Sequence, residues 1–94
     1  MFLVEHTGPG LVTLSGRLDA AEAESALRAL NELTGPTTAD CSSLEYISSA
    51  GLGVLVQTYK RLYDLGYPFR LSNVTPRIRN VLNYAGLSQL LGVG

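Results

Sequence analysis

The N-terminal part of the chain has the pattern of two β-strands joined by a turn. Residues 2–5 are mainly apolar and rich in strand-forming side chains, and residues 11–16 follow with apolar side chains at positions 12 and 14. A period of two is typical of a strand with one buried face. The turn-forming run Gly8-Pro9-Gly10 separates the two stretches. We therefore expect a β-hairpin with a loop of more than two residues.

Three later segments, residues 19–34, 48–65 and 75–85, have apolar residues at helical spacing. The first begins at Asp19, whose carboxylate can cap a helix, and Glu22 follows three residues later, as a capping box requires. The second begins near Ser48 or Ser49, and the third begins with Thr75 as the cap ahead of a proline. Glycines end them. The residues expected to face inward are Ala23, Ala26, Leu27, Leu30 and Leu33; Leu52, Leu55, Val56, Tyr59 and Leu62 or Tyr63; and Ile78, Val81, Leu82 and Ala85.

Two short segments, Thr37–Cys41 and Tyr67–Leu71, are predicted to be strands, residues 42–47 a connection, and residues 87–91 a final apolar turn. The order of elements is then ββαβαβα. Strands that alternate with helices imply a mixed sheet with parallel pairs and helical cover, which is an α/β fold. The chain has 94 residues and no linker, repeat or low-complexity tract, so we expect one domain over residues 1–94.

Composition narrows the class of protein. Hydrophobic residues make up 46% and charged residues 16%, which excludes a disordered chain. A net charge of -1 argues against a nucleic-acid binder that neutralises phosphates. A single cysteine cannot form an internal disulfide, and no apolar run approaches the roughly 20 residues of a membrane helix. We expect a soluble cytoplasmic domain without nucleic-acid or membrane partners, as a monomer or weak dimer.

The charges are unevenly distributed along the chain. Residues 1–45 hold seven acids and two bases, whereas residues 46–94 hold one acid and five bases. One interpretation is that the domain has two differently charged faces. The other is that a bipolar surface orients a charged partner.

Candidate catalytic residues are few. His6 is the single histidine and lies at the end of a predicted strand beside a turn, so we interpret it as a solvated side chain. One His and one Cys are too few for a zinc site. Gly51-Leu-Gly53 lacks both the third glycine of a dinucleotide loop and the Lys-Ser/Thr of a phosphate-binding loop. Cys41 is predicted to be an inert thiol in a buried strand. The protein is therefore predicted to be no enzyme and to need no cofactor or metal.

One segment, residues 40–55, combines four serines with two glycines around a strand-to-helix passage. Ser48 as N-cap would contribute about 1 kcal/mol, but capping needs only one serine. Gly51 and Gly53 each cost up to about 1 kcal/mol in a helix relative to alanine. They leave one side of the helix bare, so another backbone can approach closely. An exposed serine beside a bare helix surface is typical of a docking and modification site.

The same segment carries a family resemblance. Asp40-x-Ser-x-Leu-x-Tyr-Ile-Ser-Ser-Ala-Gly-Leu-Gly53 resembles the signature of STAS domains, the anti-sigma factor antagonist family. The upstream Leu14-Ser-Gly-Arg-Leu-Asp19 is similar to the family's element ahead of the first helix, and Val81–Leu87 is similar to its third-helix ending. The resemblance covers residues 3 to 93, and the family fold has the element order derived above.

The resemblance implies a regulator without catalysis of its own. The unmodified antagonist binds an anti-sigma factor that is also a serine/threonine kinase, which frees the sigma factor. The kinase phosphorylates the antagonist on one serine and binding is lost, and a PP2C-type phosphatase restores it. The acceptor position matches Ser49. The partner-binding positions that the resemblance implies are Asp19, Ser48, Ser49, Ala50, Gly51 and Gly53.

The sequence departs from the family at one position. The residue before the acceptor is usually aspartate, and here it is Ser48. Both residue types are good N-caps, so the helix start is retained while the local negative charge is not. The change affects how a kinase orients its target and makes Ser48 a competing acceptor. For Asp19, capping of the first helix and contact with a partner are both open.

A second hypothesis assigns the chain to a different class. Lone domains of this family also serve as fixed accessory subunits of lipid-transport ATPase complexes or as parts of stress-sensing scaffold assemblies. The retained Ser49 favours the switching antagonist over a fixed subunit. Co-purification separates them, because a histidine-kinase-like ATPase indicates the antagonist, whereas a transporter ATPase or a large shell indicates the subunit.

Overall fold

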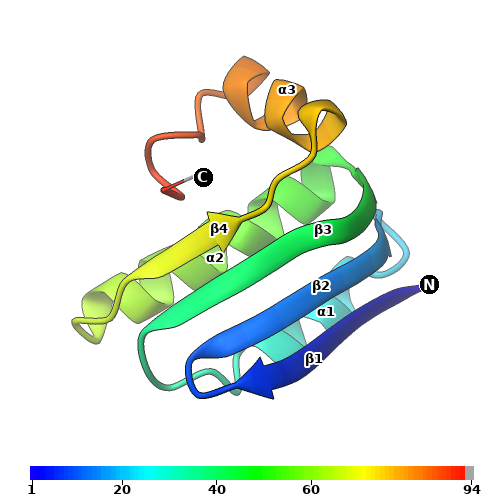
Figure 1. The fold of residues 1–94 in the computed structure, drawn as a ribbon. Helices are drawn as coiled ribbons and strands as arrows, with labels where there is room; N and C mark the ends of the chain where they lie inside the picture. The colour runs from blue at the N-terminus through cyan, green and yellow to red at the C-terminus, as the bar shows by residue number, and fades with distance from the viewer. Residues whose placement is uncertain (93–94) are drawn as a thin grey trace.

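The computed structural model describes residues 1–92, which form a four-stranded sheet and three helices. The strand order is β1-β2-β3-β4, with β1 antiparallel to β2 and the other two pairs parallel. Helices α1 and α2 lie side by side behind the sheet, and α3 lies beyond its β4 side (Figure 1). The α/β class, the mixed sheet and the order ββαβαβα predicted from the sequence are confirmed.

The N-terminal hairpin is tighter than predicted. Strands β1 (Phe2–Gly8) and β2 (Leu11–Leu18) are joined by Pro9 and Gly10 alone, so the expectation of a longer loop was wrong. The extra residue is absorbed in the ladder, because His6 pairs with Val12 and Gly8 pairs with Leu11, which leaves Thr7 without an opposite partner. Gly10 has φ +70, a left-handed conformation that glycine adopts without strain.

Strand β3 (Thr37–Ile47) is eleven residues long and includes the segment predicted to be a connection. Alternation holds up to Cys41, after which buried residues recur every third position, at Leu44 and Ile47. The pairing explains this, because the β2–β3 register shifts between Thr13 and Ser15 and again between Gly16 and Arg17. Each irregularity adds a residue to β3 and bends it. Figure 1 shows β3 curving at its end toward the start of α2.

Helix α1 (Ala23–Leu30) is shorter at both ends than the sequence pattern indicates. The carboxylate of Asp19 accepts a hydrogen bond from the amide of Glu22 at 3.2 Å, but this bond lies in a turn that precedes the helix. Asp19 is therefore not the cap of α1, and the capping-box prediction was wrong. Leu33 is buried as predicted, although it lies beyond the end of the helix.

Helix α2 (Ser49–Asp64) begins where the sequence predicts, but it is rotated about its axis. Its buried residues are Gly51, Val54, Leu55, Thr58 and Leu62. Of the predicted stripe, Leu55 and Leu62 are buried, while the side chains at 52, 56 and 59 are half-buried and the one at 63 is exposed. The bare Cα of Gly51 allows this rotation, because it lets the start of the helix pack on the end of β2.

The C-terminal elements follow the prediction with small shifts. Strand β4 covers Phe69–Ser72, and α3 covers Pro76–Tyr84 with Thr75 at its N-cap position. Ala85 was expected to face inward, but it is exposed because it lies at the C-cap of the helix. In the final turn Leu91 is buried, and its carbonyl accepts a hydrogen bond from the amide of Leu71 at 3.0 Å. This bond covers part of the β4 edge.

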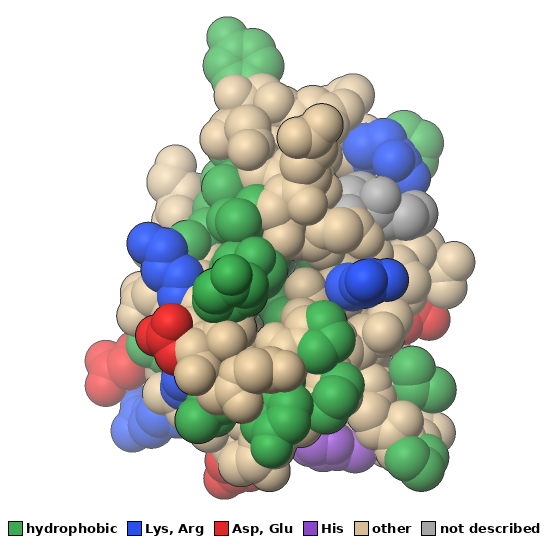
Figure 2. Space-filling model, turned by 90° about the vertical axis from the view of Figure 1, so that its left-hand side faces the viewer, with side chains coloured by type: hydrophobic (Ala, Val, Ile, Leu, Met, Phe, Trp, Pro, Cys, Tyr) green, Lys and Arg blue, Asp and Glu red, His purple; other side chains and the backbone are tan. Residues whose placement is uncertain are grey.

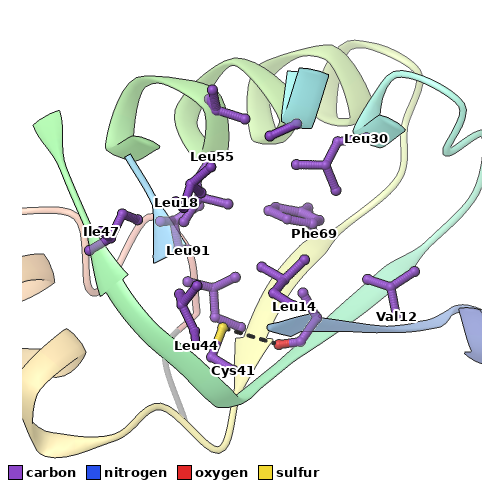
Figure 3. Packing of buried hydrophobic residues seen from close by; sticks show 14 of the residues in the cluster. Val12, Leu14, Leu18, Leu30, Cys41, Leu44, Ile47, Leu55, Phe69 and Leu91 are labelled. Carbon is purple, nitrogen blue, oxygen red and sulfur yellow. Dashed lines mark hydrogen bonds between the residues drawn. The ribbon is translucent and has the colours of Figure 1, made fainter. Parts of the chain in front are cut away.

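The core lies between the sheet and the two helices behind it. Figure 3 shows Leu14, Phe69 and Val12 pointing from the strands toward Leu30 and Leu55 on the helices. Within the described part of the chain, no helix has the length and apolar character needed to cross a membrane. Figure 2 shows the end of the molecule where the β1–β2 hairpin turns, on which hydrophobic side chains gather in small groups between Lys and Arg residues.

Candidate functional site

The hydroxyl of Ser48 is engaged by the fold. Ser48 is the N-cap of α2, and its Oγ accepts a hydrogen bond from the amide of Gly51 at 3.1 Å. The same hydroxyl donates to the carbonyl of Leu18 at 3.4 Å, and the Ser48 amide donates to that carbonyl at 3.0 Å. The capping role predicted for Ser48 is confirmed. These bonds fix the start of α2 to the end of β2.

The next two residues face solvent. Ser49 is the first residue of α2, and both Ser49 and Ala50 are exposed. Among the described residues no hydrogen-bond partner contacts the Ser49 hydroxyl. The adjacent serines therefore differ in availability, because one holds the helix in place while the other presents a free hydroxyl at the helix start.

The two glycines of α2 also have different environments. A Cβ at Gly51 would stand 2.5 Å from the carbonyl oxygen of Leu18 and 2.9 Å from a carbon of Ile47. The close backbone approach expected at Gly51 is thus made by the protein's own strand β2. At Gly53 a Cβ would meet no atom within 4 Å, so that position is open. The bare surface of α2 that remains available to another molecule is the one at Gly53.

Asp19 lies at the same end of the sheet as the two serines. Leu18 and Ile47 are paired as the last rung of the parallel strands β2 and β3, so Asp19 and Ser48 emerge next to each other. Asp19 is half-buried and its carboxylate accepts the Glu22 amide. The strand ends therefore place Asp19 beside Ser48, at the start of the helix that carries the other predicted site residues.

Asp40 contributes to the shape of the strand that leads to the site. Its carboxylate accepts a hydrogen bond from the amide of Ser42 at 2.8 Å, at the first irregularity of β3. The backbone and side-chain hydrogen bonds from Ser42 lower the pKa of Asp40 below its ordinary value of 3.8. The ionised carboxylate thereby stabilises the bend that directs β3 toward α2.

The remaining reactive groups lie away from this surface. Cys41 is fully buried, and burial, with a smaller contribution from the charge of Asp40, raises the pKa of its thiol to about 12. Its Sγ donates to the carbonyl of Ala39, so the prediction of an inert core thiol is confirmed. His6 pairs with Val12 in the hairpin half of the sheet. Across residues 1–92, no three His, Cys, Asp or Glu residues are grouped so that they could hold a metal ion.

Sequence reasoning missed two side-chain contacts, one beside the site and one at the far end of α2. The guanidinium of Arg17 lies over the ring of Tyr46, 4.4 Å from its centroid. The two residues are far apart in sequence, and only the irregular register places Arg17 opposite Tyr46. Arg61 on α2 donates to the carbonyls of Leu30 and Leu33 at 3.0 and 2.6 Å, which ties α2 to the end of α1.

The fold and the site define a small α/β domain that presents one free serine at a helix start, beside the ends of its two central strands. A sequence model of the STAS domain matches residues 2–93. The anti-sigma F factor antagonist of Paenibacillus polymyxa is 25% identical over 93 residues, which cover 94% of this chain and 80% of that protein. The chain therefore belongs to the STAS domain family.

Solved structures agree with this assignment. An anti-sigma factor antagonist from Mycobacterium paratuberculosis aligns with a TM-score of 0.78 and 26% identity, over 99% of this chain and 83% of that one. SpoIIAA in its unphosphorylated form aligns with a TM-score of 0.75 and 20% identity, over 100% of this chain and 88% of that one. SpoIIAA from Bacillus in its phosphorylated form aligns with a TM-score of 0.72 and 19% identity, over 100% of this chain and 91% of that one. The fold described above is shared with both forms.

Proposed function

We propose that this protein is an anti-sigma factor antagonist that binds an anti-sigma factor serine kinase and is released when Ser49 is phosphorylated. The observation that carries the proposal is the contrast between the adjacent serines. The Ser48 hydroxyl is held by Gly51 and Leu18, whereas the Ser49 hydroxyl is exposed and unbonded among the described residues. A kinase can reach Ser49 without breaking any bond that the fold uses.

The docking face consists of the start of α2 with the adjoining strand end, namely Asp19, Ser48, Ser49, Ala50 and Gly53. A partner chain can approach closely at Gly53, where no side chain intervenes. Gly51 is not itself available to a partner, but its packing on β2 fixes the helix start that carries this face. The curated relative from Paenibacillus polymyxa, an anti-sigma F factor antagonist, supports this class of partner.

Phosphorylation forms a bond between Ser49 Oγ and the γ-phosphorus of ATP, and ADP leaves. The hydroxyl proton passes to a base on the kinase. The product carries about -1.5 to -2 charge. A bulky hydrated dianion on the docking face opposes contact with the partner, and hydrolysis by a PP2C-type phosphatase restores binding.

The acceptor assignment is tested with the cognate kinase, ATP and mass spectrometry. Two variants separate the serines: Ser49→Ala removes the proposed acceptor, and Ser48→Asp removes the neighbouring hydroxyl while keeping a good N-cap. We expect wild type and Ser48→Asp to gain one phosphate on residue 49, and Ser49→Ala to gain none. Phosphate on Ser48 in the wild type, or full modification of Ser49→Ala, would overturn the assignment.

The partner class is tested separately by co-purification from the producing cells. A kinase of the histidine-kinase-like ATPase fold, bound by the unphosphorylated protein and released by its phosphorylated form, is the expected result. Recovery of a transport ATPase or a large scaffold in a complex that is indifferent to phosphorylation would contradict the antagonist and favour a fixed subunit.

A further inference from the structure

The last rungs of the central strands carry a preorganised cation beside the docking face. Arg17 on β2 is paired with Tyr46 on β3, and its guanidinium lies 4.4 Å from the centre of the tyrosine ring. Stacking on the ring holds a long, flexible side chain in one orientation. The ordering cost that an interface imposes on such a side chain is therefore reduced before any partner binds.

The Arg17–Tyr46 pair is exposed and lacks an acidic partner of its own. Arg17 is exposed, and 38% of the Tyr46 surface is accessible. Among the described residues, no carboxylate forms an ion pair with Arg17. Glu45, which lines the same shallow hollow on the outer face of the sheet, is not paired with it either. The guanidinium fork thus remains available to a carboxylate from outside.

The pair lies close enough to Ser49 for one interface to cover both. Consecutive Cα atoms are about 3.8 Å apart, so the Cα of Tyr46 is at most about 11 Å from that of Ser49. The paired strand places Arg17 about 5 Å further across the sheet. A standard interface buries about 800 Å² on each partner, a patch roughly 30 Å across, and so spans both features.

We propose that the Arg17–Tyr46 pair is a second anchor of the docking face, and that Arg17 receives an acidic side chain of the anti-sigma factor kinase. Arginine and tyrosine are, with tryptophan, the residue types enriched among the energetic anchors of interfaces. Here the guanidinium offers a planar fork to a carboxylate, while the ring offers apolar surface beneath it. This inference rests on the proposed function and adds the chemistry that the partner must present opposite β2.

The test measures the affinity of the unphosphorylated protein for its cognate kinase at low and at physiological salt. Charge reversal in Arg17→Glu is expected to weaken binding by about tenfold or more, with the larger effect at low salt. Arg17→Lys, which keeps the charge without the planar fork, is expected to lose less. The matched control is Arg70→Glu, which reverses an exposed arginine on the same sheet. Arg70 pairs with Thr38, near the opposite end of the strands, and its variant should bind like wild type.

The outcomes are distinguishable. Wild-type affinity of Arg17→Glu, in a preparation where phosphorylation of Ser49 still abolishes binding, overturns this inference and leaves the proposed function standing. The same is true if Arg17→Glu alters only the phosphorylated form, which would make Arg17 an internal phosphate contact. Failure of the wild-type protein to bind the kinase overturns both. An equal loss in Arg70→Glu overturns the local role of Arg17, since it would indicate general charge steering.

Discussion

The Cα of Gly51 packs directly on the carbonyl oxygen of Leu18, so closely that a Cβ at this position would stand 2.5 Å from the oxygen. That same oxygen accepts hydrogen bonds from the amide and the hydroxyl of Ser48. One carbonyl at the end of β2 therefore determines where α2 begins and, with it, where Ser49 is presented.

Replacing Gly51 by alanine should destabilise the domain. Alanine has the higher helix propensity by up to about 1 kcal/mol, but its methyl group would overlap backbone that has no room to move. Overpacking of this kind costs about 1–3 kcal/mol, so the net change should be a lower melting temperature, by several degrees in a domain of this size. The matched control is Gly53→Ala, where space is open and thermal stability should be equal to or above that of wild type. Equal melting temperatures for the two variants would contradict the packing.

Gly53→Lys should separate binding from stability. The position is open, so lysine should leave the melting temperature unchanged or raise it by its better helix propensity. On the proposed docking face, however, the long side chain would prevent close approach of the partner and reduce affinity by about tenfold or more. Thr34→Lys, on an exposed loop away from the proposed face, is the matched control. Unchanged kinase affinity of Gly53→Lys would remove Gly53 from the interface.

Arg61 should contribute more to the free energy of unfolding than a surface arginine does. Its guanidinium satisfies the carbonyls of Leu30 and Leu33 where α1 ends. Arg61→Met keeps much of the apolar stem and removes both hydrogen bonds, so we expect a loss of about 1–3 kcal/mol in chemical denaturation. Arg28→Met, which removes only an exposed pair with Glu24, should change stability little. Similar unfolding midpoints for both variants would show that the carbonyls find water instead.

Much of the fold could be predicted from local patterns. Helical spacing, the Thr75-Pro76 start and the Ser48 cap placed two of the three helices to within about two residues. The errors have a common cause, which is that long-range pairing overrides local pattern. Ser42 to Ile47 do not alternate, yet they form a strand because two irregularities let β3 stay paired with β2. Likewise, the rotation of α2 about its axis depends on the contact between Gly51 and Leu18, which no local pattern encodes.

The candidate site was predicted in part. The motif located both serines, and Ser48 was correctly predicted to be the N-cap. The sequence did not reveal that the Ser48 hydroxyl also donates to the carbonyl of Leu18, thirty residues earlier. The motif also treated both glycines alike, whereas one packs on β2 and the other is open. The stacking of Arg17 on Tyr46 depends on the shifted register, so it could not be predicted from the sequence. The assignment of Ser49 as acceptor remains a prediction.

Phosphorylation of Ser49 should act locally and leave the fold intact. The added charge of about -1.5 to -2 would lie at the N-terminus of α2, where backbone amides and the helix dipole favour an anion. Salt screens its field beyond about 8 Å, and the bonds made by Ser48 do not involve the modified hydroxyl. We therefore expect a melting temperature no lower than that of the unmodified protein, together with loss of kinase binding.

The measurement that checks this is a comparison of backbone amide shifts in the two forms. Changes should be confined to the start of α2 and the adjoining ends of β2 and β3. Ser49→Asp should keep the native spectrum and bind the kinase more weakly, although less so than the phosphorylated form because its charge and volume are smaller. Thr34→Glu, which adds a negative charge away from the proposed face, should bind normally. If the shifts extend through β1 and α3, the partner is released by a conformational change, because a charge screened within about 8 Å cannot perturb both elements directly.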